Sequence, residues 1–92
     1  MTGYTIKLSS QFRKQLKMAK KRGKQLDKLE TVVDILANDL PLPEKYRDHA
    51  LTGNWVNHRE CHIEPDWLLI YYKQDDVLVL SLVATGSHSD LF

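Results

Sequence analysis

The sequence predicts an α+β fold in which two helices near the N-terminus pack on one face of a β-sheet. Three observations predict it: helical spacing of apolar residues between residues 10 and 40, extended apolar runs after residue 58, and short turn sequences between those runs. A chain of 92 residues suits one small core. We therefore expect residues 1–92 to form a single domain.

The N-terminal quarter begins with a short strand and continues as a helix. Residues 4 to 8 (YTIKL) alternate as a strand does, and the serine pair Ser9 and Ser10 offers an N-cap. Apolar residues then recur at helical spacing as far as residue 19, and Gly23 is a typical helix stop.

A second helix is predicted from residue 27 to residue 40. Asp27 and Glu30 have the spacing of an acidic capping box, and an apolar stripe runs at helical spacing from Leu29 to Leu40. Pro41 ends the helix, because proline lacks the N–H that would continue it. We interpret the stripe as the face that packs on the sheet.

Three strands are predicted after a polar loop (residues 41–55). They are "HRECHI", "LLIYYK" and "VLVLSLVAT", and the turn sequences "EPDW" and "QDD" separate them, before the tail "GSHSDLF". Connections this short join antiparallel neighbours. The element order is therefore β-α-α-β-β-β, with the last three strands in an antiparallel sheet.

The composition excludes several classes of protein. One cysteine, Cys61, excludes an internal disulfide framework and a multi-cysteine zinc motif, and is typical of a reducing compartment. No apolar run approaches the roughly 20 residues of a membrane span. The first ten residues also lack a signal-peptide pattern. We expect a cytoplasmic protein that does not contact membranes.

Charge is distributed unevenly along the chain. The first 24 residues hold eight of the thirteen Lys and Arg and none of the twelve acidic residues. Such an asymmetry indicates a face that contacts a polyanion, of which nucleic acid is the commonest, although a solvated basic helix face has the same pattern. The eight cations are Lys7, Arg13, Lys14, Lys17, Lys20, Lys21, Arg22 and Lys24.

The spacing of two histidines raises the question of a metal site. His58 and His62 form an H-x-x-x-H pair, which binds one metal ion when it lies on a helix. In the strand predicted here the two residues stand about 13 Å apart, at roughly 3.3 Å per residue. We therefore expect no metal and no other cofactor.

Acid–base chemistry is the other use of these histidines. Cleavage of RNA without a metal needs a base for the ribose 2′-hydroxyl, cations for the charged phosphorus and an acid for the leaving 5′-oxygen. Histidine can fill either proton-transfer role at neutral pH. Candidates for base, acid and orienting carboxylate are His49, His62, Asp66 and His88, although each is also an ordinary surface or turn residue.

Cations and aromatic rings for the substrate are also present. Arg59, Lys45 and Arg47 can supply positive charge, and Trp67 and Phe92 offer faces on which an RNA base stacks. The simplest interpretation of Trp67, at the start of an apolar strand, is nevertheless a core residue.

Three motifs resemble one family. "LPLPEKYRDHALTGNW", "RECHIEPDWLLIYY" and "ATGSHSDLF" are similar, in order and spacing, to the YafQ-type branch of the RelE superfamily. These are toxins of bacterial toxin–antitoxin systems that cleave messenger RNA on the ribosome. The resemblance covers nearly the whole chain and implies a RelE-like fold and a ribosome-dependent, metal-independent endoribonuclease that leaves a cyclic phosphate.

The resemblance also implies roles for individual residues. His49 matches the loop histidine beside the scissile phosphate, His62 and Asp66 match residues required for cleavage, and His88 matches the proposed general acid. His62 and Asp66 compete for the role of base. Phe92 matches an aromatic residue that positions the message.

The resemblance implies less specific roles at other positions of the motifs. Trp67 matches a tryptophan that is structural or contacts the substrate, and Arg59 is expected to bind the substrate. Glu60 stands in place of an aspartate and Cys61 in place of a small residue, so the resemblance assigns no role to either.

The resemblance names partners as well. The eight N-terminal cations would contact ribosomal RNA, and a cognate antitoxin of the RelB or DinJ type would mask the toxin and supply all contact with operator DNA. The alternative from another class is a non-catalytic RNA- or antitoxin-binding module that retains the fold.

Overall fold

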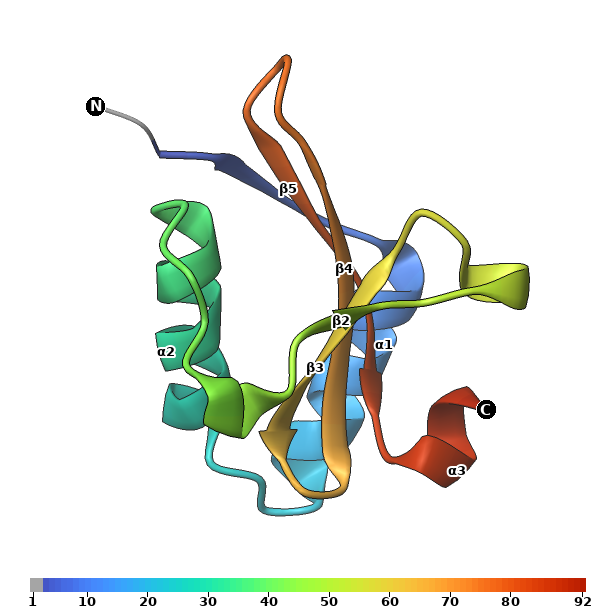
Figure 1. The fold of residues 1–92 in the computed structure, drawn as a ribbon. Coiled ribbons are helices and arrows are strands. Elements are labelled where there is room, and N and C mark those ends of the chain that lie inside the picture. The colour runs from blue at the N-terminus through green and yellow to red at the C-terminus, as the bar shows by residue number, and fades with distance from the viewer. Residues whose placement is uncertain (1–2) are drawn as a thin grey trace.

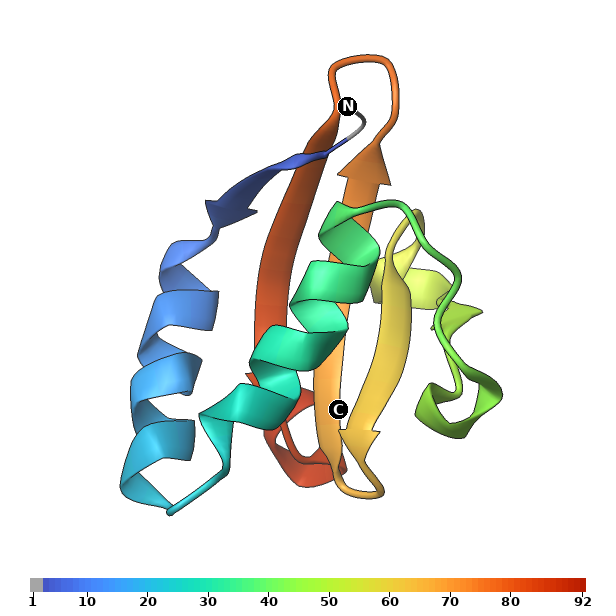
Figure 2. The same ribbon diagram turned by 90° about the vertical axis from the view of Figure 1, so that its left-hand side faces the viewer.

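One mixed sheet organises the protein, whose computed structural model describes residues 3–92. The strand order is β1-β5-β4-β3-β2, and α1 and α2 lie side by side across one face (Figures 1 and 2). The strands are β1 (Thr5–Leu8), β2 (His49–Ala50), β3 (Arg59–Glu64), β4 (Trp67–Gln74) and β5 (Val79–Gly86). The α-helices are α1 (Ser10–Lys21), α2 (Leu26–Ala37) and α3 (His88–Leu91), and two 3₁₀ turns span Glu44–Tyr46 and Gly53–Trp55.

The predicted α+β fold is confirmed, with one difference in the sheet. Strands β3, β4 and β5 form the expected antiparallel meander. Strand β1, however, pairs in parallel with β5, from Thr5 opposite Val79 to Leu8 opposite Leu82. This parallel pair makes the sheet mixed. The sequence did not predict it, because pairing between the two ends of the chain leaves no mark on local turn sequences.

Helix α1 starts and stops where the sequence predicted. The Ser9 hydroxyl accepts the backbone N–H of Phe12 at 2.9 Å as an N-cap. Beyond the helix, Gly23 has a φ of +79°, a left-handed conformation that glycine adopts without steric cost.

Helix α2 differs from its predicted limits at both ends. It begins after Gln25, whose side chain makes no capping hydrogen bond, so the predicted capping box at Asp27 was wrong. It ends at Ala37, because Asp39 turns into the left-handed region at a φ of +57°. Leu40 therefore leaves the apolar stripe and is 56% exposed.

Two segments predicted as irregular carry short elements. The loop at residues 41–55 contains β2, and the C-terminal tail contains α3. Strand β5 starts two residues later than predicted, because Leu78 belongs to the preceding turn with a φ of +52°. Both β2 and α3 become part of the candidate site.

The core lies between the two long helices and the sheet. Phe12, Val32 and Leu36 pack with Cys61 and Ile63 of β3 in one buried cluster. Side chains alternate along a strand, so the residues next to Cys61 and Ile63 point away from the helices. The face opposite the helices therefore receives Glu60 and His62.

No helix in residues 3–92 has both the length and the apolar character that crossing a membrane requires.

Candidate active site

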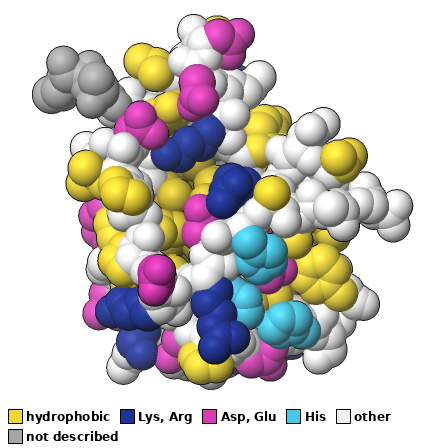
Figure 3. Space-filling model, viewed as in Figure 1, with side chains coloured by type: hydrophobic (Ala, Val, Ile, Leu, Met, Phe, Trp, Pro, Cys, Tyr) yellow, Lys and Arg dark blue, Asp and Glu magenta, His cyan; other side chains and the backbone are white. Residues whose placement is uncertain are grey.

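Three histidines from separate elements lie together on the face opposite the long helices. His49 comes from β2, His62 from β3 and His88 from the start of α3. The ring centroids of His49 and His62 are 6.3 Å apart, and those of His62 and His88 are 5.6 Å apart. Figure 3 shows the histidines gathered on one face of the molecule.

A buried carboxylate joins two of these histidines. Glu60 is only 4% exposed, and one of its oxygens lies 3.4 Å from Nε2 of His49 and 3.3 Å from Nε2 of His62. Burial of a carboxylate is costly unless polar partners surround it. Glu60 therefore belongs to the histidine cluster. The sequence assigned no role to Glu60. Its position two residues before His62 on a strand was the available signal, because it places both side chains on one face.

Backbone carbonyls orient the same two rings. Nδ1 of His49 lies 2.7 Å from the carbonyl oxygen of Arg47, and Nδ1 of His62 lies 3.3 Å from that of Pro65. Because a carbonyl oxygen only accepts, each Nδ1 donates its proton there. In a neutral ring Nε2 is then the basic atom, and it can donate to the Glu60 oxygen beside it only after it takes up a proton.

Asp66 orients the third histidine. One oxygen of its carboxylate accepts the backbone N–H of His88 at 3.1 Å and lies 3.0 Å from Nδ1 of the same residue. These two hydrogen bonds lower the pKa of Asp66 below its ordinary value of 3.8, and the one from the backbone N–H has the larger effect. An ionised Asp66 makes Nδ1 of His88 the donor and leaves Nε2 without a hydrogen bond to the described residues.

The lowered pKa of Asp66 leads to a titration prediction. In the His88→Ala variant the ring hydrogen bond is lost while the backbone N–H remains, so the pKa of Asp66 should rise only part of the way to 3.8. The hydrogen bonds of ionised Asp66 to His88 stabilise the folded protein at pH values above 3.8, the ordinary pKa of an aspartate. This stabilisation is lost as the pH falls through the lowered pKa of Asp66. Carbon-13 NMR titration of the carboxyl groups measures this, with Asp90 as an internal control that should not move.

Cations line a cavity beside His62. Lys45 and Arg47 border a space of about 460 Å³ together with His62, and so does Lys28, which pairs with Glu64 at 2.9 Å. The sequence predicted positive charge from Lys45 and Arg47, and the cavity brings both next to the histidine. Such groups can stabilise the charge of a phosphate there.

Arg59 and Trp67, two of the predicted substrate-binding residues, make contacts within the protein. The Arg59 guanidinium pairs with Asp48, with Nη2 to Oδ2 at 3.1 Å, and no hydrogen bond or ion pair joins it to a histidine within residues 3–92. The Trp67 side chain is 1% exposed, and its Nε1 donates to Thr85 Oγ1 at 3.0 Å. No open ring face remains on Trp67 for a base to stack, so of its two expected roles the structure favours the core one.

Phe92 lies beside the histidine cluster, whereas His58 lies outside it. Phe92 is 61% exposed, with its ring centroid 6.4 Å from that of His88, so it can contact a substrate held there. His58 instead packs edge-on against Trp55 and Tyr72, at 5.5 Å and 5.1 Å. His58 is thus the one histidine that joins no part of the cluster within the described chain.

The predicted polyanion-binding cations divide into two groups. Arg22 pairs with Asp90 at 2.9 Å, and Lys24 lies 3.8 Å from Glu64. The other six are exposed and have no ion pair within residues 3–92. These six are Lys7, Arg13, Lys14, Lys17, Lys20 and Lys21.

A metal ion is a second chemical use of the same cluster. Glu60, His62 and His88 each offer one ligand atom, and these atoms lie within 4.8 Å of one another. Two imidazoles and a carboxylate are the ligands of many catalytic zinc sites. This set differs from the H-x-x-x-H pair of His58 and His62, which was not expected to bind a metal, because His58 packs against Trp55 and Tyr72.

Comparisons with known proteins identify relatives of the chain. A family model described as "Bacterial toxin of type II toxin-antitoxin system, YafQ" matches residues 4–92. The mRNA interferase toxin YafQ of Escherichia coli K12 is 44% identical over 88 residues, which are 95% of this chain and 94% of the relative.

Solved structures agree in fold along nearly the whole chain. The E. coli DinJ–YafQ toxin–antitoxin complex contains a chain with a TM-score of 0.89 and 43% identity, covering 98% of both chains. A metal-bound toxin from Helicobacter pylori has a TM-score of 0.91 and 46% identity, covering 97% of this chain and 99% of that one.

Proposed function

Because this chain belongs to the YafQ family of type II toxin–antitoxin toxins and is an mRNA interferase, we propose that it cleaves messenger RNA on the ribosome by metal-independent acid–base catalysis. The observation that carries this proposal is the meeting of two oriented histidines, His62 beside Glu60 and His88 beside Asp66, with ring centroids 5.6 Å apart. Such a pair can remove one proton and supply another across a single phosphate.

His62 is the base in this proposal. Its Nε2 takes the proton of the ribose 2′-hydroxyl, and the imidazolium that forms donates to the Glu60 carboxylate 3.3 Å away. Asp66 is the weaker candidate, since its lowered pKa and its hydrogen bonds to His88 reduce its basicity. His49, which shares Glu60, assists by stabilising charge.

His88 is the acid. The 2′-oxygen forms a bond to phosphorus, the bond from phosphorus to the 5′-oxygen breaks, and Nε2 of His88 protonates that oxygen. Asp66 holds the ring through Nδ1 and stabilises its charged form before transfer. The products are a 2′,3′-cyclic phosphate and a 5′-hydroxyl, with Lys45 and Arg47 balancing charge at phosphorus and Phe92 contacting the message.

The partners follow from family membership and charge. Exposed cations of α1 contact ribosomal RNA through phosphates, which gives affinity without sequence information. The E. coli relative is crystallised with DinJ, so we expect an antitoxin of the RelB or DinJ type to mask this toxin and to make any contact with operator DNA. Activity on ribosomes would place the protein in the cytoplasm.

Purified toxin tests the proposal directly. It should cleave messenger RNA on programmed ribosomes, leave the same RNA intact without them, and produce 2′,3′-cyclic phosphate ends by mass spectrometry. Equal cleavage of naked RNA would contradict ribosome dependence. Tight binding of an antitoxin without any cleavage would favour the non-catalytic module instead.

A metal-assisted nuclease is the second candidate, favoured by the cluster of Glu60, His62 and His88. A chelator selective for transition metals distinguishes the two, because EDTA would also remove the magnesium that ribosomes need. Metal-independent catalysis predicts an unchanged rate. Loss of cleavage, restored by added zinc, would support metal assistance.

A further inference from the structure

Helix α3 is a single turn that carries the proposed acid. It spans only His88–Leu91, and a helix of this length is not stable by itself. Its position relative to His62 therefore depends on what holds it to the rest of the protein. The carboxylates of Asp66 and Asp90 make hydrogen bonds that do so.

The first carboxylate belongs to Asp66 in the turn between β3 and β4. It binds the backbone N–H and Nδ1 of His88, as described above. This contact sets the ring but holds only the first residue of α3.

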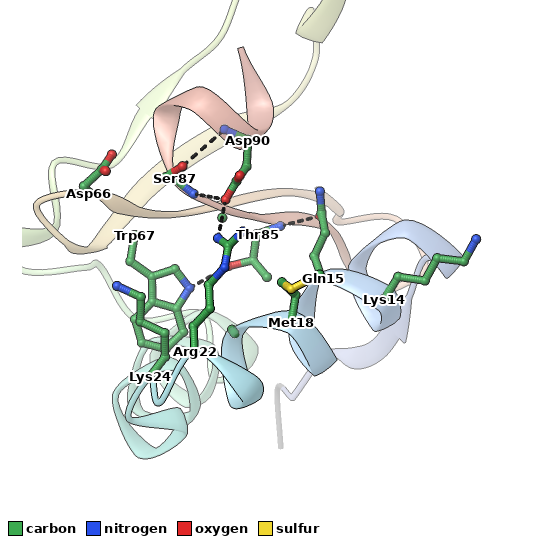
Figure 4. Close-up of a pocket in the computed structure, with 12 residues that line it drawn as sticks. Lys14, Gln15, Met18, Arg22, Lys24, Asp66, Trp67, Thr85, Ser87 and Asp90 are labelled. Carbon is green, nitrogen blue, oxygen red and sulfur yellow. Dashed lines mark hydrogen bonds and ion pairs between the residues drawn. The ribbon is translucent and has the colours of Figure 1, made fainter.

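The second carboxylate belongs to Asp90 inside α3. Its Oδ2 accepts the backbone N–H of Ser87 at 3.0 Å, while the Ser87 hydroxyl accepts the backbone N–H of Asp90 at 3.2 Å. This reciprocal pair is a capping box that closes the turn around His88. The same Oδ2 also accepts Nη1 of Arg22 at 2.9 Å, which connects α3 to the end of α1 (Figure 4).

The backbone leaves room for this connection at Gly86. A Cβ at Gly86 would stand 3.0 Å from both Cβ and Oδ2 of Asp90, and the φ there is +158°. A larger residue would push the Asp90 carboxylate away from its partners. Hydrogen bonds thus link Arg22 at the end of α1 to Asp90, and Asp90 to Ser87, which directly precedes His88.

We propose that Arg22 and Asp90 are positioning residues for cleavage, which hold α3 against α1 so that His88 faces His62. The proposal deepens the proposed function and rests on it, since it assumes that His88 protonates the leaving oxygen. It also removes Arg22 from the cations assigned to ribosomal RNA, because its guanidinium already binds a carboxylate within the protein.

The exposure of the pair decides what kind of effect to expect. The Arg22 and Asp90 side chains are 51% and 33% exposed, and exposed ion pairs contribute little to overall stability. The consequence of breaking the pair should therefore appear in the cleavage rate rather than in unfolding. We expect the rate on saturating ribosomes to fall about fivefold in Arg22→Ala, with an unchanged half-saturating ribosome concentration.

A double-mutant cycle tests the connection. Asp90→Asn retains an amide oxygen for the Ser87 N–H and loses the charge that binds Arg22. If the two residues act through each other, Arg22→Ala combined with Asp90→Asn should be no slower than the slower single variant. Arg22→Lys, which keeps the charge, should recover part of the rate.

Lys21→Ala is the matched control, since Lys21 neighbours Arg22 and has no ion pair within residues 3–92. Its effect should add to that of Asp90→Asn. If Arg22→Ala instead weakened ribosome binding at an unchanged maximal rate, and added to Asp90→Asn, then Arg22 would be an RNA contact and the proposal would be wrong.

NMR tests the positioning role without relying on RNA cleavage, so it is independent of the proposed function. Amide and ring signals of His88 should shift in Arg22→Ala and stay in place in Lys21→Ala, whether or not the protein cleaves RNA. Unmoved His88 signals in Arg22→Ala would overturn the positioning role, even if wild-type cleavage were confirmed.

Discussion

Replacement of His88 by alanine should lower the rate of messenger RNA cleavage on ribosomes by about 10²- to 10⁴-fold, the usual contribution of a general acid. The side chain is 55% exposed, so its removal leaves no cavity and should not disturb the fold. Ribosome binding should persist, because the cations of α1 are untouched. Single-turnover cleavage with ribosomes in excess measures the chemical step apart from binding.

His58→Ala provides the matched control for this variant. It removes another imidazole, one that packs against Trp55 and Tyr72 outside the cluster. Its cleavage rate should stay within a small factor of wild type. A His88→Ala protein that cleaved at the wild-type rate would exclude His88 as the acid and leave His49 and His62 to divide both proton transfers.

Replacement of Trp67 by alanine should instead destabilise the protein, by about 3 to 5 kcal/mol. The indole is among the largest fully buried side chains, and its Nε1 donates to Thr85 Oγ1, which in turn donates to the carbonyl of Leu68 at 2.7 Å. Small domains have only about 5 to 15 kcal/mol of stability. Urea denaturation followed by circular dichroism should therefore show a large fall in the transition midpoint.

The comparison with Trp55→Ala separates burial from chemistry. Trp55 is only partly buried, so the same substitution there should cost clearly less. Trp67→Phe, which keeps an aromatic ring in the core, should also recover much of the stability and the cleavage rate. If Trp67→Ala retained wild-type stability while cleavage was lost, the tryptophan would contact the substrate and its assignment to the core would fail.

The order of the main elements was predictable because local signals determine it. Ser9 and Gly23 define the limits of α1, and the Pro65–Asp66 turn forces β3 and β4 into an antiparallel pair. The limits of α2 were less predictable. Asp27 looked like a cap and Leu40 like part of the apolar stripe, yet the chain turned left-handed at Asp39 before that stripe was complete.

The sequence predicted which residues form the site, but not how they contact one another. The motifs around His49, His62, Asp66 and His88 identified the family, but no pattern in them showed that Glu60 lies between two imidazoles. Equally, the cluster of cations in the first 24 residues did not distinguish Arg22 from Lys21. That difference depends on Asp90, which lies 68 residues away along the chain.

By itself the sequence determined the order of the main elements and the chemical groups available, because caps, turns and apolar spacing act over a few residues, while the family followed from the resemblance of three motifs. Only the tertiary structure decided that β1 joins β5 in parallel, that Trp67 is buried, and that Asp66 orients His88. Each of these depends on contacts between residues far apart in the chain. Such contacts form when apolar faces are buried together, and that burial brings His62 and His88 to the same end of the sheet.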